Sequence, residues 1–122
     1  SIFEKSSQSD NIIKDLSDKI EILKQHHAND IIIDPGFGFG KTLEQNFKLL
    51  HELELFQCLE SPILTGLSRK SMIWRTLNSS PDQALNGTSI LNTIALLKGA
   101  KILRVHDVKE AKEAITLISK LA

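Results

Sequence analysis

The sequence predicts an α/β fold in which about three short parallel strands alternate with helices. Three apolar runs, at residues 30–34, 62–66 and 101–105, are each too short for a helix and are separated by stretches with helical periodicity. Strands joined by helical crossovers lie parallel. The 122 residues are enough for one domain but too few for a complete eight-stranded α/β barrel, which needs roughly 200 residues.

The first helix and the first strand are predicted in the N-terminal third of the chain. A helix over about residues 9–25 is indicated by apolar residues at spacings of four, four and three. These residues are Ile12, Leu16, Ile20 and Leu23. Residues 30–34 are three isoleucines between two aspartates, and Pro35 follows them. A continuous β-branched run of this kind suits a parallel strand that is covered on both faces.

The middle of the chain predicts a helix, a strand and a short helix. Thr42 and Gln45 form a capping-box pattern, and helical spacing continues from there to about residue 55. Residues 62–66 form the second strand. A short helix is then expected to begin near Lys70 and to end before Asn78.

The last third predicts two more helices around the third strand. Ser80, followed by Pro81 and Gln83, indicates a helix start with a serine cap. Residues 101–105 form the strand, and Asp107 is expected to cap the final helix. The side chains expected to face inward on that helix are Ala111, Ala114, Ile115 and Ile118.

Composition limits the partners and the compartment. Fifteen Lys and Arg residues balance fifteen Asp and Glu residues, so no net positive field attracts nucleic acid. No apolar stretch approaches the roughly 18 residues of a membrane span, and the first residues lack a signal-peptide pattern. A single cysteine cannot form an intrachain disulfide. We therefore expect a cytoplasmic protein without nucleic-acid or membrane partners.

Polar and glycine-rich segments follow each predicted strand, at 34–41, 66–71 and 104–107. In parallel α/β sheets, ligands bind beyond the carboxyl ends of the strands. The chemistry of the chain is therefore expected at one edge of the sheet.

The first of these segments contains three glycines but fits neither common nucleotide-binding pattern. A Walker loop needs a glycine where the chain has Pro35, and the even spacing of Gly36, Gly38 and Gly40 differs from the dinucleotide fingerprint. A flexible connection is one interpretation. The alternative is that the two phenylalanines of the segment stack on a flat ligand.

Asp34, at the start of the same segment, also has two interpretations. Its carboxylate can accept two parallel hydrogen bonds from an amino-pyrimidinone edge, or it can form the turn before Pro35.

The other two strand ends carry cations. Two hydroxyl and two basic residues in succession at a helix start suit an anion, although a solvated basic turn has the same composition. They are Ser68, Arg69, Lys70 and Ser71. Arg104 and His106, one residue apart after a strand, are expected to point the same way and suit a pyrophosphate.

The remaining histidines and the cysteine carry no predicted chemistry. His26, His27 and His51 are interpreted as surface residues, and no metal site is predicted. Cys58 is expected to be a small buried apolar residue.

Taken together, four blocks resemble the C-terminal half of the dihydropteroate synthase family. The blocks are residues 34–41, 66–72, 87–88 and 104–108, and both their order and their spacing match. The resemblance implies a pterin-binding enzyme of folate biosynthesis, a sulfonamide target, with an eight-stranded (β/α)8 (TIM) barrel. Residues 1–122 would be the C-terminal part of that barrel domain and would supply its last three strands.

The resemblance also implies the reaction and the residues that perform it. The enzyme condenses 6-hydroxymethyl-7,8-dihydropterin diphosphate with 4-aminobenzoate, which gives 7,8-dihydropteroate and pyrophosphate. The implied pterin-binding residues are Asp34, Phe39, Gly66, Lys70 and Arg104. The implied 4-aminobenzoate-binding residues are Phe39, Ser68, Arg69 and Ser71. Arg104 and His106 would bind the pyrophosphate, and these two with Lys70 would be catalytic.

Magnesium is implied as a cofactor, with its ligand in the N-terminal half of the family that this sequence does not match. Barrel strands without their neighbours would expose apolar surface, so we expect the chain to self-associate or to pair with that N-terminal half. The isolated chain is then expected to be inactive. The alternative functions are a non-catalytic α/β module, a P-loop-type nucleotide hydrolase and a phosphate-binding domain.

Overall fold

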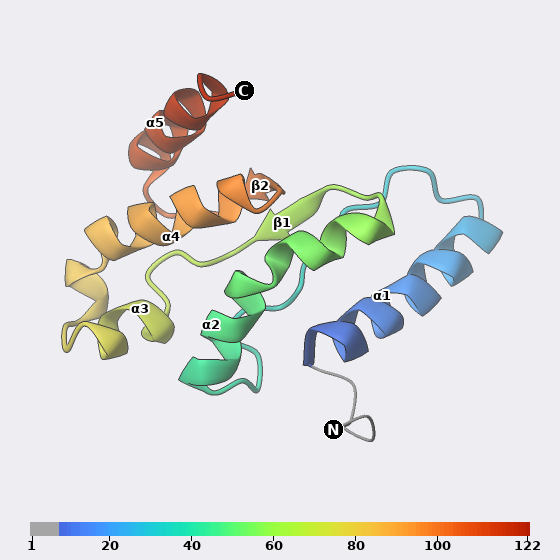
Figure 1. The fold of residues 1–122 in the computed structure, drawn as a ribbon, viewed down its shortest axis with the longest axis horizontal. Helices are drawn as coiled ribbons and strands as arrows, with labels where there is room; N and C mark the ends of the chain where they lie inside the picture. Colours follow the sequence, from blue (N-terminus) through green and yellow to red (C-terminus); the bar gives the residue numbers. More distant parts are fainter. Residues whose placement is uncertain (1–7) are drawn as a thin grey trace.

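The structure, a computed structural model, describes residues 8–122 as helices packed against a small parallel sheet (Figure 1). The α-helices are α1 (Gln8–Gln25), α2 (Leu43–His51), α3 (Ser71–Thr76), α4 (Leu85–Leu97) and α5 (Val108–Ser119). The strands are β1 (Ile63–Thr65) and β2 (Ala100–Leu103), and two 3-10 helices are η1 (Leu53–Leu59) and η2 (Pro81–Gln83). The α/β class and the alternation of helices with strands are confirmed.

The number of strands differs from the expectation of three. β1 and β2 pair in parallel, whereas the run at 30–34 contributes only an isolated parallel bridge between Ile33 and Ile63. The last strand also lies slightly earlier than expected, at Ala100–Leu103 instead of 101–105.

Two prolines explain why the run at 30–34 forms a bridge and not a strand. Ile33 donates its N–H to the carbonyl of Pro62 at 2.9 Å, and its own carbonyl accepts from the N–H of Leu64 at 2.8 Å. The next ladder bond toward the N-terminus would need an N–H on Pro62. The next one toward the C-terminus would need an N–H on Pro35. Proline has no N–H to donate, so pairing stops on both sides of Ile33.

The predicted helices form, with differences at some starts and at one end: the helix expected to reach about residue 55 ends at His51, and the 3-10 helix η1 follows it. The Thr42 hydroxyl accepts from the N–H of Gln45 and the Gln45 side chain accepts from the N–H of Thr42, so the capping box is confirmed. Ser80 makes no side-chain cap bond: the 3-10 helix η2 follows it, and α4 begins only at Leu85. Asp107 does not cap α5 with its side chain either, because its carboxylate is paired elsewhere, as described below.

The helices cover one face of the sheet. The core contains large side chains from the sheet, from the 34–41 loop and from α2, η1 and α3. Its fully buried members include Ile63, Phe37, Leu49, Leu53, Phe56 and Met72. On the final helix only Ala111 is buried, and Ile115 is 44% exposed, so the inward stripe expected there is narrower than predicted.

The opposite face of the sheet is open. The register pairs Leu64 with Ile102, and both are half-buried, while Ile32, which alternates with Ile33, is 56% exposed. Alternate residues of a strand point to opposite faces, so these three side chains lie on the face that turns away from the core. We call Ile32, Leu64 and Ile102 the open sheet face.

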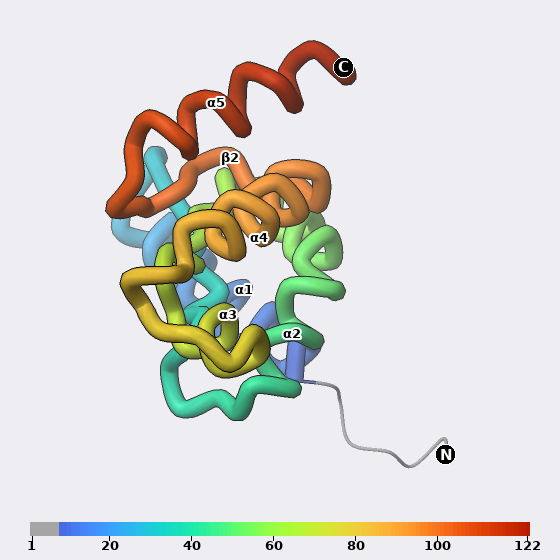
Figure 2. The backbone as a smooth tube through the Cα atoms, turned by 90° about the vertical axis from the view of Figure 1, so that its left-hand side faces the viewer, coloured from blue at the N-terminus to red at the C-terminus, as the bar shows by residue number. Residues whose placement is uncertain are grey.

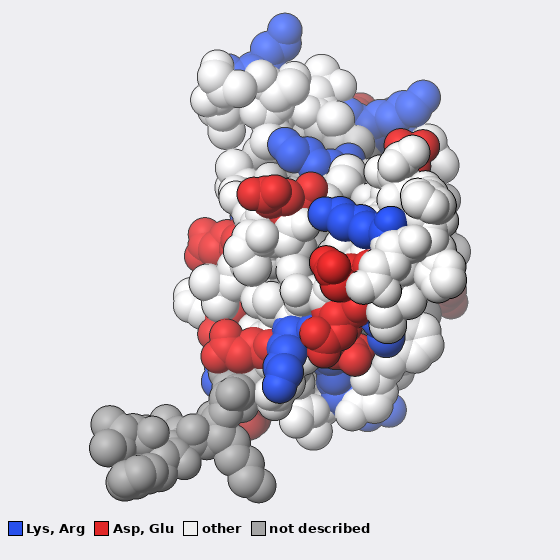
Figure 3. All heavy atoms as spheres, turned by 90° about the vertical axis from the view of Figure 1, so that its right-hand side faces the viewer, with Lys and Arg blue, Asp and Glu red and all other residues white. Residues whose placement is uncertain are grey.

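Helix α5 lies at one end of the molecule, beside α4 and away from α1 (Figure 2). No helix within residues 8–122 is both long and apolar enough to span a membrane. On the face in Figure 3, acidic and basic side chains are interspersed, which matches the balanced charge of the sequence.

Candidate active site

The ends of three chain segments meet at one edge of the sheet. Arg104 follows β2 directly, and its Nη1 lies 3.7 Å from Oδ2 of Asp34, which follows the Ile33 bridge. Gly66 follows β1 and lies under the same arginine: a Cβ at Gly66 would be only 2.6 Å from Nη2 of Arg104. The absence of a side chain at Gly66 is therefore what allows Arg104 to lie across the end of β1 and face Asp34.

Asp34 performs the turn-forming role that the sequence left open. Its Oδ1 accepts the N–H of Gly36 at 2.9 Å, which fixes the carboxylate relative to the loop. The side chain is 37% exposed, and Oδ2 faces Arg104. One carboxylate oxygen thus holds the turn while the other lies at the strand-end site.

The loop after Asp34 is a tight turn that depends on its glycines. Gly36, Gly38 and Gly40 have φ values of +84°, +90° and +61°, a region that glycine adopts without steric cost. Lys41 folds back on the loop, and its Nζ donates to the carbonyl of Gly36 at 2.6 Å. In the structure this lysine therefore stabilises the loop itself.

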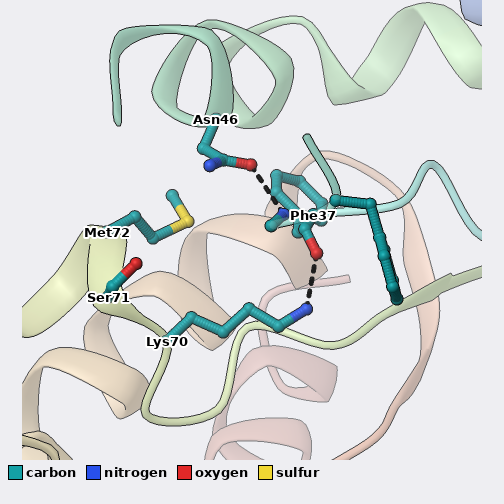
Figure 4. Close-up of a pocket in the computed structure, with 7 residues that line it drawn as sticks. Phe37, Asn46, Lys70, Ser71 and Met72 are labelled. Carbon is teal, nitrogen blue, oxygen red and sulfur yellow. Dashed lines mark hydrogen bonds between the residues drawn. The ribbon is translucent and has the colours of Figure 1, made fainter. Parts of the chain in front are cut away.

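A pocket of about 290 Å³ opens between this loop and the start of α3 (Figure 4). We call it the aromatic pocket, and its lining residues are Phe37, Gly38, Phe39, Asn46, Lys70, Ser71 and Met72. Phe39 is 74% exposed, whereas Phe37 is 1% exposed and belongs to the core. Only Phe39 therefore offers a ring to a ligand, and the idea that both phenylalanines stack on one is wrong.

Lys70 lies at the centre of the site. Its Nζ donates to the carbonyl of Phe37 at 2.6 Å and lies 5.9 Å from the centroid of the Phe39 ring. Burial lowers the pKa of Lys70 below its ordinary value, and the nearby charge of Arg104 lowers it further, while Asp34 opposes the shift. These interactions place the ammonium group near both Asp34 and Arg104.

A second pocket, of about 280 Å³, lies on the other side of Lys70. We call it the cationic pocket, and its lining residues are Gly66, Ser68, Lys70, Arg104, Val105 and His106. The hydroxyl of Ser68 lies 2.7 Å from Nδ1 of His106 and also accepts the N–H of His106 at 3.2 Å. Arg104 and His106 line the same pocket, together with Val105 between them, so both side chains expected to bind a pyrophosphate lie at one site.

Arg69 points away from both pockets. Its Nε and Nη2 each donate to one carboxylate oxygen of Asp107 at 3.0 Å, and its Nη1 donates to the carbonyl of Pro81 at 2.8 Å. This two-bond pairing raises the pKa of Arg69 and lowers that of Asp107. The guanidinium group thus ties the segment before α3 to the loop that precedes α5.

Two polar residues hold the site although the sequence assigned them no role, even though Thr88 lies in one of the four blocks of the family resemblance. The buried side chain of Asn46 accepts the N–H of Gly38 at 2.8 Å, and the hydroxyl of Thr88 accepts the N–H of Arg69 at 3.0 Å. For Asn46, the one indication in the sequence was that a polar residue stands at a position where the helical periodicity predicts an apolar one. The separations along the chain, 8 residues from Gly38 to Asn46 and 19 from Arg69 to Thr88, do not reveal these contacts.

The residues without predicted chemistry lie mostly as expected. His26, His27 and His51 are exposed. Cys58 is exposed as well, so the prediction that it is buried is wrong: it lies in η1, whose inward positions are taken by Leu53 and Phe56. Within residues 8–122, no group of three or more His, Cys, Asp or Glu side chains is arranged to hold a metal ion.

Comparison with known proteins agrees with the resemblance seen at the strand ends. Residues 4–106 match the family described as "Pterin binding enzyme". The chain is 48% identical over 88 residues to dihydropteroate synthase of Escherichia coli, which covers 72% of this chain and 31% of that protein. It is 44% identical over 108 residues to dihydropteroate synthase of Clostridium beijerinckii, which covers 86% of this chain and 40% of that protein.

The fold agrees as well. A crystal structure of Yersinia pestis dihydropteroate synthase, described as a sulfonamide drug complex, superposes with a TM-score of 0.90 at 38% identity. That match covers 97% of this chain and 44% of the other, so the chain spans less than half of the proteins it resembles. Because the family match covers most of the sequence and the strand-end residues gather as such a site requires, the chain belongs to the pterin-binding enzyme family.

Proposed function

We propose that this chain forms part of a dihydropteroate synthase, a transferase of folate biosynthesis. The enzyme would join 6-hydroxymethyl-7,8-dihydropterin diphosphate to 4-aminobenzoate and release pyrophosphate. The observation that carries the proposal is that Asp34, Lys70 and Arg104, from three separate segments, meet beside two adjoining pockets. One pocket is aromatic and the other cationic, as an aromatic acid and a pterin diphosphate require.

The pterin would lie at the strand ends, beside Asp34. A carboxylate there can accept hydrogen bonds from the ring N–H and the exocyclic amine of the amino-pyrimidinone edge. Lys70 would donate to the ring oxygen and nitrogen. Gly66 would line this site through its backbone, and Phe39 would contact the ring from the aromatic side.

The 4-aminobenzoate would occupy the aromatic pocket. Phe39 would form its wall, and Ser71, the first residue of α3, would receive the carboxylate. Ser68 would flank the channel with its hydroxyl. Arg69 would flank it through its position in the backbone, since its guanidinium donates to Asp107 and Pro81.

The reaction follows from these positions. Arg104 and His106 would bind the diphosphate and stabilise the negative charge that develops as the bond between the methylene carbon and the diphosphate oxygen breaks. The amine of 4-aminobenzoate would attack that carbon, form the new C–N bond and lose one proton. The protein supplies position and charge, and no covalent intermediate with a side chain is required.

Within residues 8–122, no group of three or more His, Cys, Asp or Glu side chains is arranged to hold the magnesium ion that the family resemblance implies, and its ligand would lie in the N-terminal half of the family.

We also propose that residues 1–122 are the C-terminal part of a (β/α)8 barrel domain in a cytoplasmic protein. The open sheet face of Ile32, Leu64 and Ile102 would then be covered, either by the remaining strands of the barrel or by a second copy of the chain. The burial of apolar surface is the driving force for either arrangement.

The direct test is an assay with the full-length protein that contains this chain. Supplied with the pterin diphosphate, 4-aminobenzoate and Mg²⁺, it is expected to form dihydropteroate and pyrophosphate in equal amounts. Arg104→Gln should lower kcat/KM by about a hundredfold, the typical effect of removing one preorganised donor from a developing anion. Lys101→Gln is the matched control, because Lys101 is an exposed cation on β2, the strand that Arg104 follows, and it lines neither the aromatic nor the cationic pocket. Pyrophosphate binding without any pterin-dependent reaction would instead favour the simple phosphate-binding domain.

A further inference from the structure

One peptide unit of the glycine-rich loop is held at both of its polar ends (Figure 4). The carbonyl of Phe37 accepts a hydrogen bond from Nζ of Lys70 at 2.6 Å. The N–H of Gly38, in the same peptide plane, donates to Oδ1 of Asn46 at 2.8 Å. A rotation of this peptide would break both bonds at once, so the two contacts reinforce each other.

Asn46 is itself fixed in orientation. It lies on α2, it is 4% exposed, and its Nδ2 donates to the carbonyl of Thr42 at 3.1 Å. Because the nitrogen of the amide faces Thr42, the oxygen must face Gly38. A buried amide with both ends satisfied is a rigid anchor, and its removal leaves a loop N–H without its acceptor.

The held peptide determines where Lys70 lies. A Cβ at Gly38 would be 3.4 Å from Cδ of Lys70, so the loop backbone passes close to the lysine stem while the Phe37 carbonyl binds its ammonium group. Lys70 lines both the aromatic pocket and the cationic pocket. The shape of both pockets therefore depends on the peptide between Phe37 and Gly38.

We propose that Asn46 is a positioning residue for the reaction. By accepting the N–H of Gly38, it fixes the peptide whose carbonyl orients Lys70, and so it sets the geometry of both pockets without contacting a reacting atom. The catalytic part of this inference rests on the function proposed above.

The test compares three substitutions in the full-length protein. Asn46→Ala should raise the KM for 4-aminobenzoate and for the pterin diphosphate by about five- to fiftyfold, the range for a buried N–H that loses its acceptor. Asn46→Asp keeps an acceptor oxygen for Gly38 but sets its second oxygen against the carbonyl of Thr42, so its KM values should lie between those of wild type and those of Asn46→Ala. Thr42→Ala is the matched control, since it weakens the start of the same helix without touching Gly38, and it should lower the melting temperature at unchanged KM.

Equal KM values in Asn46→Ala and Thr42→Ala would overturn the proposal, because the effect of Asn46 would then be one of helix stability. Amide hydrogen exchange on wild type gives a measurement that needs no variant: the N–H of Gly38 should be protected, and exchange at the rate of an unstructured peptide would refute the inference. A wild-type protein that forms no dihydropteroate would contradict the proposed function, while protection of Gly38 would still test the anchor itself.

Discussion

At the scale of single residues, Arg69 follows a strand end at the site, but its side chain stabilises the fold by pairing with Asp107. Arg69 has a φ of +53°, which is uncommon for a residue with a side chain, and three of its side-chain nitrogens donate to neighbours. The two bonds to Asp107 join segments 38 residues apart along the chain. Arg69 therefore holds the α3 start and the α5 start together.

The pair predicts how stability depends on pH. The pKa of Asp107 is lower in the folded protein than its ordinary value of 3.8, mainly because Arg69 donates to the carboxylate. A carboxyl group with a depressed pKa stabilises the folded protein at pH values above its unfolded-state pKa. This contribution is lost as the pH falls through its folded-state pKa. Asp107→Asn should therefore lower the urea midpoint at pH 7, and the difference from wild type should narrow below about pH 4.

Urea unfolding of both proteins at pH 7 and pH 3 checks this prediction. Asp82→Asn is a suitable control, because Asp82 is an exposed carboxylate near Arg69 that accepts none of the guanidinium hydrogen bonds described above. A difference between wild type and Asp107→Asn that is the same at both pH values would argue against an ionised pair.

The sequence predicted some of these residues and missed others for a physical reason. Asp34, Arg104 and His106 were predictable because residues that follow parallel strands gather at one edge. The pairing of Arg69 with Asp107, and of Gly38 with Asn46, depends on how the connecting segments fold back in three dimensions. Local patterns contain no signal for such contacts, and both partners also have ordinary local roles as caps or helix residues.

At the scale of secondary structure, the start of α2 was predictable because its determinants are local. The Thr42 hydroxyl accepts the backbone N–H of Gln45 at 3.1 Å, and the Gln45 side chain accepts the backbone N–H of Thr42 at 2.9 Å. Thr42→Ala should lower the free energy of unfolding by about 1 kcal/mol, whereas Thr42→Ser keeps the hydroxyl and should be close to wild type. Chemical denaturation of the three proteins measures this, and an equal loss in both variants would show that the methyl group matters and the cap does not.

The run at 30–34 shows where element prediction fails. Its β-branched composition is typical of a strand, and Ile33 does pair with Ile63. The ladder can extend only if its hydrogen bonds do not require an N–H from Pro62 or Pro35. The register of the two segments decides this, and the sequence does not reveal the register. The sequence contained both prolines, but their effect on pairing became apparent with the structure.

At the scale of the whole molecule, the open sheet face predicts association. Ile32 is 56% exposed, and it shares a face of the sheet with Leu64 and Ile102, which are half-buried. Residues 1–122 expressed alone should therefore associate at micromolar concentration. Replacing both Ile32 and Leu64 with Thr should reduce that association, because Thr exposes less apolar surface. Thr is β-branched, so it preserves the branching of Ile32 and introduces it at Leu64, which suits an extended backbone.

Light scattering and sedimentation of the two proteins measure the effect. A wild-type chain that remains a cooperatively unfolding monomer at this concentration would argue that the open sheet face needs no partner.

The central claim concerns the whole molecule, because it requires three distant segments to form one pterin site. Calorimetric titration of the full-length protein with a pterin, compared with Asp34→Asn, tests it most directly. The substitution keeps the size of the side chain and removes its charge, so the affinity should fall by about ten- to hundredfold, as expected for a charge-assisted hydrogen bond worth roughly 1.5 to 3 kcal/mol. An unchanged affinity in Asp34→Asn would contradict the account.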